Sequence, residues 1–262
     1  MQYTAEYACI SHPGKVRRNN QDNFILLGQH MPPDNAGSGG VHTGTIHADA
    51  LPALLGVFDG MGGEERGEMA AYIAAHTAAG YRLTGRDTDD LKQLCQRANA
   101  AICAYAEENG IQTTGTTADL LLLGREKVGV ANLGDSRIYL VDASGIRQLS
   151  QDHVMPAPTG HKPPLLQYLG IPEQEMRLEP TIIERPAAEG ETYLMCSDGL
   201  TDMVPVEKIE SIIRGAASLP QAAQQLLDRA LGAGGRDNVT LVLCRIHLPR
   251  GGLMGLLDRV FG

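Results

Sequence analysis

Short apolar runs alternate along the chain with turn-forming stretches, and two pairs of longer segments have helical spacing. Runs of this length and composition are typical of β-strands. The predicted strands cover residues 7–11, 22–28, 53–60, 118–124, 127–134, 136–142, 192–198 and 238–246. Apolar positions at helical spacing predict helices over residues 65–80, 89–108, 206–216 and 219–231. Residues 29–50 are rich in Gly, Pro, Asn and His and are predicted to form a loop.

The order of these elements predicts the fold class. The strands follow one another through short turns, which favours antiparallel sheets over a parallel sheet with regular crossovers. The helices occur in pairs between blocks of strands. We therefore expect an α+β fold with a central β-sandwich of two antiparallel sheets flanked by helices, in α/β/β/α layers. Residues 249–262 form a short tail that is predicted to dock as a helix on its own domain, with contact to a partner or a membrane as the alternative.

Composition and charge limit the classes of function that are compatible with the sequence. The chain has 262 residues, of which 43% are hydrophobic, so it can bury a large core. Its formal net charge of -9 argues against general nucleic-acid binding, which depends on Lys and Arg to neutralise phosphates. No apolar stretch approaches the roughly 20 residues that a membrane span needs, and the N-terminus lacks a signal-peptide pattern.

Cysteine usage points to a reducing compartment. The chain contains an odd number of cysteines and no C-x-x-C motif, which disfavours a disulfide framework or a zinc ribbon. Buried free thiols in the cytoplasm are the simplest interpretation. The cysteines are Cys9, Cys95, Cys103, Cys196 and Cys244.

An acidic residue recurs at or near the end of an apolar run. Taken singly, each of these residues has a structural explanation, because Asp-Gly is a strong hairpin-turn signal and Asp also caps turns. Taken together, carboxylates at strand ends on one edge of a sandwich converge and repel one another, and divalent cations relieve that repulsion. Oxygen ligands without Cys suit Mg²⁺ or Mn²⁺ better than zinc. The residues are Asp22, Asp59, Asp135, Asp198 and Asp237.

The segments around these residues resemble an ordered set of family motifs. They read G-K-V-R-R-N-N-Q-D, V-F-D-G-M-G-G, G-T-T-A, N-L-G-D-S-R, Q-D-H, C-S-D-G-L-T-D and G-G-R-D-N-V-T, and they extend from Gly14 to about Leu243. This set is similar to that of the type 2C metal-dependent protein serine/threonine phosphatases, in particular the bacterial members. The fold of that family, a β-sandwich flanked by helices, agrees with the fold expected from the order of elements.

The resemblance implies a role for each matched residue of the metal core. Asp59 resembles the carboxylate that bridges two catalytic metals, and Asp198 and Asp237 resemble the remaining ligands of one of them. Gly60 resembles the residue that offers its backbone carbonyl to the other metal. Asp22 resembles the carboxylate that holds that metal through its waters.

Three further positions bear on catalysis. Asp135 resembles the ligand of a third, weaker metal in bacterial members, and Arg17 resembles the arginine that grips the substrate phosphate. Met61 stands where animal members carry a histidine thought to protonate the leaving group, and a thioether has no proton to give. Metal-bound water is then the favoured proton donor, with His153 or His161 as the alternative. The stretch between Asp152 and Pro180 is shorter than the usual bacterial flap and rich in proline.

The implied activity is hydrolysis of phosphoserine and phosphothreonine in proteins by a hydroxide activated between two Mn²⁺ or Mg²⁺ ions. The resemblance also implies a signalling role that opposes a bacterial Ser/Thr kinase. Residues 1–248 are expected to form the phosphatase domain. A non-catalytic phosphoprotein-binding module of the same fold is the alternative, although every matched aspartate is present. A transition-metal site at His30, His42 and His47 is disfavoured, because their spacings match no face of a helix or strand.

Overall fold

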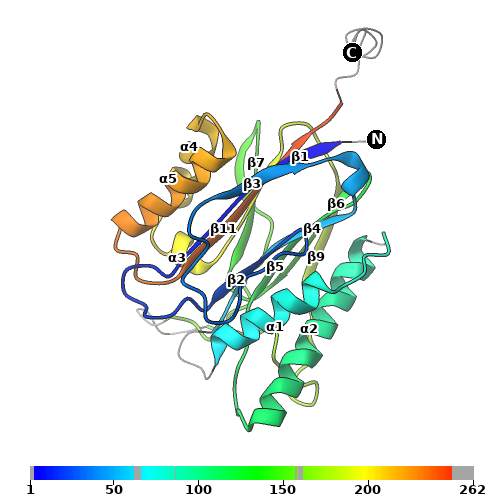
Figure 1. The fold of residues 1–262 in the computed structure, drawn as a ribbon, viewed down its shortest axis with the longest axis vertical. Coiled ribbons are helices and arrows are strands. Elements are labelled where there is room, and N and C mark those ends of the chain that lie inside the picture. The colour runs from blue at the N-terminus through cyan, green and yellow to red at the C-terminus, as the bar shows by residue number, and fades with distance from the viewer. Residues whose placement is uncertain (1–2, 62–65, 86, 157, 159–161, 250–262) are drawn as a thin grey trace.

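Two antiparallel sheets pack face to face, and helices cover the outer face of each (Figure 1). This arrangement is seen in a computed structural model that describes residues 3–61, 66–85, 87–156, 158 and 162–249. The expected α/β/β/α order is confirmed. Within the described residues, no helix is both long enough and apolar enough to cross a membrane.

The first sheet has six strands in the order β3-β1-β11-β10-β7-β8. Its central strands, β1, β10 and β11, are largely buried, which explains their apolar composition. The strands are β1 (Thr4–His12), β3 (His42–Ile46), β7 (Arg137–Asp142), β8 (Gly145–Gln148), β10 (Thr192–Cys196) and β11 (Val239–His247).

The second sheet has five strands in the order β2-β4-β5-β6-β9. Strand β5 has the sequence ADLLLL and is buried along its whole length, because the other sheet covers one face and helices cover the other. The strands are β2 (Asp22–Leu26), β4 (Ala53–Asp59), β5 (Ala118–Leu123), β6 (Lys127–Leu133) and β9 (Thr181–Pro186).

Each sheet has its own helical layer. Helices α1 and α2 pack on the second sheet, whereas α4 and α5 pack on the first. The alanine-rich face of α1 is buried, and its small side chains let the helix lie close to the sheet. The helices are η1 (Ala48–Ala50), α1 (Gly67–Ala79), α2 (Asp87–Asn109), α3 (Asp198–Thr201), α4 (Val206–Gly215) and α5 (Leu219–Gly232).

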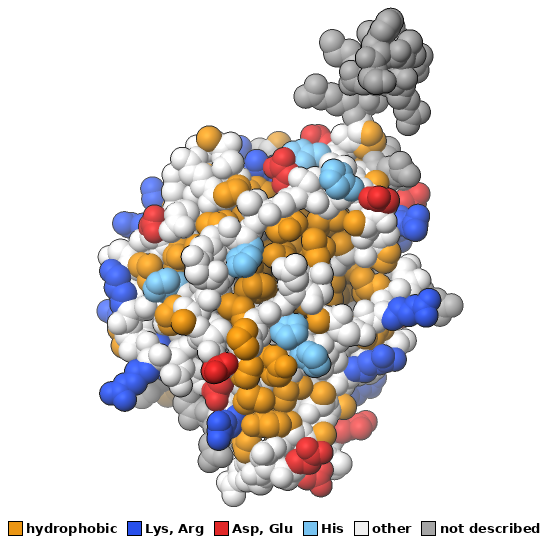
Figure 2. Space-filling view, viewed as in Figure 1, with side chains coloured by type: hydrophobic (Ala, Val, Ile, Leu, Met, Phe, Trp, Pro, Cys, Tyr) orange, Lys and Arg blue, Asp and Glu red, His pale blue; other side chains and the backbone are white. Residues whose placement is uncertain are grey.

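Three apolar clusters match these layers. One lies between the sheets, and the other two lie between each sheet and its helices. On the face shown in Figure 2, hydrophobic side chains gather near the centre, and most charged side chains lie around the rim. With no Trp and 3 Phe in the chain, aliphatic residues fill most of this core, as the composition predicts.

The prediction of a loop over residues 29–50 was wrong in part. Residues His42–Ile46 form β3, which pairs with β1 at the edge of the first sheet. Strands β8 and β9 were also missed, and both are edge strands as well. An edge strand gains its stability from backbone pairing with one neighbour and needs no long apolar run. The predicted tail helix lies almost entirely outside the described residues.

Candidate active site

Two aspartates of the second sheet lie opposite each other on neighbouring strands. Asp22 is the first residue of β2 and Asp59 is the last residue of β4, and the antiparallel register pairs their Cα atoms. Thr117 fixes the end of β4, because its hydroxyl accepts from the Asp59 N–H at 3.0 Å and its N–H donates to the Asp59 carbonyl at 2.9 Å. The strand register therefore brings the two carboxyl groups to one end of the sheet.

The first sheet contributes two more aspartates at the same end of the sandwich. Asp198 follows β10 and begins α3, and Asp237 precedes β11. The two sheets are joined here by hydrogen bonds. The Ser197 hydroxyl donates to Asp22 Oδ2 at 2.8 Å, and the Gln21 N–H donates to Asn238 Oδ1 at 2.8 Å. The expected convergence of acidic strand ends is thus present in the fold.

Two carboxyl groups of this cluster, those of Asp22 and Asp59, resist ionisation. Burial raises the pKa of Asp22 to about 7, and repulsion from Asp198 and Asp237 adds to the effect. Burial, followed by repulsion from Asp22 and Asp198, raises the pKa of Asp59 well above its usual range. In addition, Asp22 Oδ1 is buried and has no hydrogen-bond partner among the described residues. Divalent cations would relieve the repulsion and would give this oxygen a partner.

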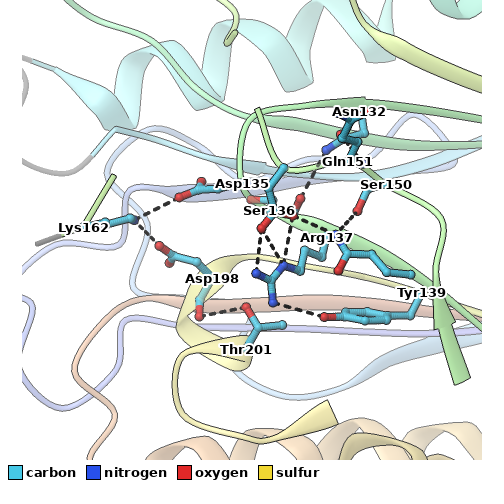
Figure 3. Close-up of polar contacts among 12 residues, drawn as sticks. Asn132, Asp135, Ser136, Arg137, Tyr139, Ser150, Gln151, Lys162, Asp198 and Thr201 are labelled. Atoms are coloured by element: carbon cyan, nitrogen blue, oxygen red, sulfur yellow. Dashed lines mark hydrogen bonds and ion pairs between the residues drawn. The ribbon is translucent and has the colours of Figure 1, made fainter. Parts of the chain in front are cut away.

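Lys162 lies beside the cluster and was not identified from the sequence. Its ammonium group contacts Asp198 Oδ2 and lies 3.5 Å from Asp135 Oδ2, so it points between the two carboxylates (Figure 3). Partial burial lowers the pKa of Lys162, but attraction to Asp198, Asp59 and Asp135 outweighs it and raises the pKa overall. Lys162 is a single lysine in a Pro-rich stretch, and the sequence around it does not indicate that its side chain reaches the aspartates.

The motif residues around Asp135 position the turn that carries it. Arg137 forms a bidentate ion pair with Asp152, with its Nη2 at 2.7 Å from Oδ2. The Asn132 side chain donates to the Ser136 carbonyl at 3.2 Å (Figure 3). These residues of the N-L-G-D-S-R and Q-D-H motifs therefore have a structural role, since they hold the β6–β7 turn against the following loop.

Arg17 lies at the edge of the acidic cluster. Its Nη2 donates to Asp237 Oδ2 at 2.7 Å, and its side chain remains 41% exposed. The hydrogen bond to Asp237 and attraction to Asp59 and Asp198 raise its pKa, although burial opposes them. A guanidinium that is both accessible and directed at the cluster can meet an anion that enters from solvent.

Comparison with known proteins identifies the family. The model of the protein phosphatase 2C family matches residues 12–158. The serine/threonine phosphatase Stp of Listeria welshimeri is 31% identical over 261 residues, which cover 91% of this chain and 95% of Stp. The chain belongs to the protein phosphatase 2C family. It is a serine/threonine protein phosphatase, and its substrates are phosphorylated proteins.

A second bacterial phosphatase of this family supports the same conclusion. PstP of Mycobacterium tuberculosis is 29% identical over 254 residues, which cover 92% of this chain and 45% of PstP. A crystal structure of the PstP catalytic domain in complex with two manganese ions superposes with a TM-score of 0.75 at 28% identity, covering 94% of this chain and 100% of that domain. Membership of the family implies that this phosphatase uses divalent metal ions.

His153 is held in place through both of its ring nitrogens. The Gly134 N–H donates to His153 Nδ1 at 3.2 Å, so Nδ1 is unprotonated, and Nε2 contacts Thr181 Oγ1 at 2.9 Å. Burial also lowers the pKa of His153. Both ring nitrogens are thus engaged in holding the loop after β8. His161 lies outside the described residues. At the position where animal members carry a histidine, the Met61 N–H donates to the Gly115 carbonyl at 3.0 Å.

Proposed function

We propose that this phosphatase hydrolyses phosphoserine and phosphothreonine at a two-metal centre built from Asp22, Asp59, Asp198 and Asp237. The observation that carries the proposal is the register of β2 and β4, which sets Asp22 opposite Asp59, together with the Ser197–Asp22 hydrogen bond from the other sheet. Asp59 would bridge the ions, and the Gly60 carbonyl would complete one of the two sites. All donors are oxygens, which suits Mn²⁺ or Mg²⁺.

When bound, two such ions supply positive charge to the phosphoryl group and lower the pKa of water toward neutrality. The residues of the chain do the positioning. Thr117 holds Asp59 through two hydrogen bonds, and Ser197 orients Asp22 by donating to Oδ2. Arg17 would bind the phosphate oxygens through its planar fork of donors, which a lysine does not offer. No residue of the acidic cluster then has to form a covalent bond to phosphorus.

A wider role is proposed by analogy with the bacterial phosphatases that this chain resembles. We propose that residues 1–248 form the catalytic domain and that the enzyme opposes a bacterial Ser/Thr kinase in signalling. A non-catalytic phosphoprotein-binding module would not need the acidic cluster, so its assembly from both sheets favours catalysis. The test is release of phosphate from phosphoserine, phosphothreonine and phosphotyrosine peptides with Mn²⁺, Mg²⁺ or excess chelator. We expect metal-dependent release from the first two, and binding of all peptides without release would favour the non-catalytic module.

Arg17→Ala tests the proposed phosphate clamp. If Arg17 binds the phosphate mainly in the ground state, the substitution should raise KM about tenfold and lower kcat less. Because the Arg17–Asp237 ion pair is partly exposed and screened by solvent, its loss should leave Mn²⁺ affinity nearly unchanged. Steady-state kinetics and calorimetry would measure both quantities. Arg18→Ala is the matched control, since Arg18 is an exposed neighbour; an unchanged KM with weakened Mn²⁺ binding would show that Arg17 serves the metal centre instead.

Lys162→Met tests the third-cation position. We propose that a third ion held by Asp135 and Asp198 has to displace the Lys162 ammonium, which makes that ion the weakest of the three. Removing the competing charge should tighten the weak Mn²⁺ site about tenfold, or roughly 1.4 kcal/mol, while the core pair changes less. Calorimetric titration measures each site. Lys208→Met, on the exposed face of α4, is the control, and an unchanged weak site in Lys162→Met would refute the competition.

A further inference from the structure

Two histidines from different elements meet on the surface, outside the aspartate cluster. His30 follows the tight turn after β2, and His76 lies in the second half of α1. His30 Nε2 and His76 Nδ1 are 3.3 Å apart. The sequence grouped His30 with His42 and His47, but His42 instead uses its Nε2 to contact the Ser38 carbonyl at 3.2 Å. His30 and His76 are 46 residues apart in the sequence, so no local pattern predicted that they meet.

The backbone around His30 is rigid. Leu26 and Gln29 exchange two backbone hydrogen bonds of 2.9 and 3.0 Å, which close a two-residue hairpin turn. The next residue, Met31, is held at both backbone groups by the Asn23 side chain, with two hydrogen bonds of 3.0 Å. The partner, His76, lies on α1, whose alanine face packs on the same sheet. The two imidazole rings are thus positioned by regular structure and not by a mobile loop.

The tautomer of His30 is defined by its surroundings. His30 Nδ1 lies 3.1 Å from the Met31 carbonyl, which can only accept, so Nδ1 carries the proton. Nε2 is then a lone-pair donor, and it faces His76. A histidine that ligates a metal commonly donates its other N–H to a backbone carbonyl in this way.

Tyr72 fixes the orientation of both rings. Its ring stacks on His76 at a centroid distance of 5.7 Å and an interplanar angle of 20°. It also meets His30 edge-on, at 5.4 Å and 70°. Both contacts restrict ring rotation, so little side-chain entropy would be lost if an ion joined the two nitrogens.

We propose that His30 and His76 form a binding site for a divalent transition-metal ion of the zinc class. Metal–nitrogen distances of about 2.0–2.1 Å at a tetrahedral angle separate two ligating nitrogens by about 3.3–3.4 Å, which matches the 3.3 Å observed. The ion takes the place of the proton shared by the two rings. Two histidines fill two positions of a tetrahedral site, so water would complete the coordination.

The chemistry of this site differs from that of the aspartate cluster. Imidazole nitrogen suits Zn²⁺, Cu²⁺ and Ni²⁺, whereas Mg²⁺ and Mn²⁺ prefer carboxylate oxygen. A bound ion would link the β2 hairpin to α1. These elements lie at the two ends of the segment that carries Asp59 and Gly60, and β2 itself begins with Asp22. The His pair would thus bind an ion that does not replace the activating ions, and would stabilise the elements around them.

The test is a competition titration of Zn²⁺ with a chromophoric chelator, with Mg²⁺ in excess to reduce binding to the aspartates. We expect one site in the wild-type protein whose affinity falls at least tenfold in His76→Gln and in His30→Gln. His47→Gln is the matched control, because His47 is also exposed but lies outside the pair. Zinc should also raise the melting temperature of wild type and His47→Gln, but not that of either pair variant. Equal zinc affinity in wild type and in both pair variants would overturn the proposal, and a folding defect in one variant leaves the other as the test.

Discussion

Replacing Asp59 by Asn should lower kcat roughly 10³-fold or more while the protein stays folded. A metal centre supplies several kcal/mol of transition-state stabilisation, and each 1.36 kcal/mol is tenfold in rate. Asp59 is the residue that faces Asp22 across β2 and β4, so its loss affects both proposed ions. Steady-state kinetics on a phosphothreonine peptide with Mn²⁺ would measure the effect, and calorimetry should show the loss of tight Mn²⁺ binding.

The stability of this variant separates a catalytic role from a structural one. Burial and neighbouring carboxylates raise the pKa of Asp59. A raised folded-state pKa means that the protonated carboxyl contributes stability that is fully present below the unfolded pKa and is lost as pH rises through the folded pKa, so the ionised group does not stabilise the metal-free fold. The metal-free Asn variant should thus melt no lower than wild type. Asp228→Asn, on the exposed face of α5, is the control; near-normal turnover in Asp59→Asn would remove Asp59 from the metal centre.

Replacing Gly199 by Ala should destabilise the protein by roughly 3 kcal/mol or more, at the upper end of overpacking effects. An added Cβ would lie 1.9 Å from the Asn238 carbonyl oxygen and 2.9 Å from its carbon. Both atoms belong to backbone, which cannot move without shifting the start of β11. Denaturant unfolding of the metal-free protein measures the change directly, and turnover should fall with it because Asp198 and Asp237 flank this contact.

Gly232→Ala is the matched control for this prediction. Gly232 ends α5, and a Cβ there would have no heavy atom within 4 Å. Alanine favours helix over glycine by about 0.8–1.0 kcal/mol, so this substitution should be neutral or stabilising. An unfolding midpoint in Gly199→Ala equal to that of wild type would show that α3 has room to move away from the start of β11.

The close approach of the Asn238 carbonyl to Gly199 also explains why the two Asp-Gly dipeptides were ambiguous in the sequence. Asp59-Gly60 and Asp198-Gly199 both read as hairpin turns, yet neither forms one. Gly60 and Gly199 are needed because backbone carbonyls pass too close for a side chain. That requirement depends on segments far apart in the chain. A local turn rule contains no information about such distant neighbours.

Buried strands were predictable from sequence, and edge strands were not. Residues 118–123 read ADLLLL and could only be stable inside the protein, so β5 was clear from its composition. Strand β3 reads HTGTI, is mostly exposed, and is stabilised by its hydrogen bonds to β1. The predicted fold class was correct although the edge strands were missed, because the central strands and the helix pairs already define two sheets covered by helices.

The sequence predicted those site residues that stand at a fixed place in the ordered motifs. It did not predict contacts between residues that only the tertiary fold brings together. The aspartates of the cluster were identified by their place at strand ends. The ion pair of Arg17 with Asp237 spans 220 residues, and the contact of Lys162 with Asp198 arises from an irregular segment. Ser197 lies within the predicted strand 192–198, and the sequence did not indicate that its hydroxyl connects the two sheets. Such pairings follow from the packing of the sandwich.

The most direct test of the proposed metal centre is a crystal structure with Mn²⁺, using anomalous scattering at the manganese edge. We predict two strong anomalous peaks at the end of the sandwich, with a carboxylate oxygen of Asp59 between them. Asp198 and Asp237 should contact one peak, and the Gly60 carbonyl should contact the other. A single peak, or peaks that do not touch Asp59, would contradict the two-metal account.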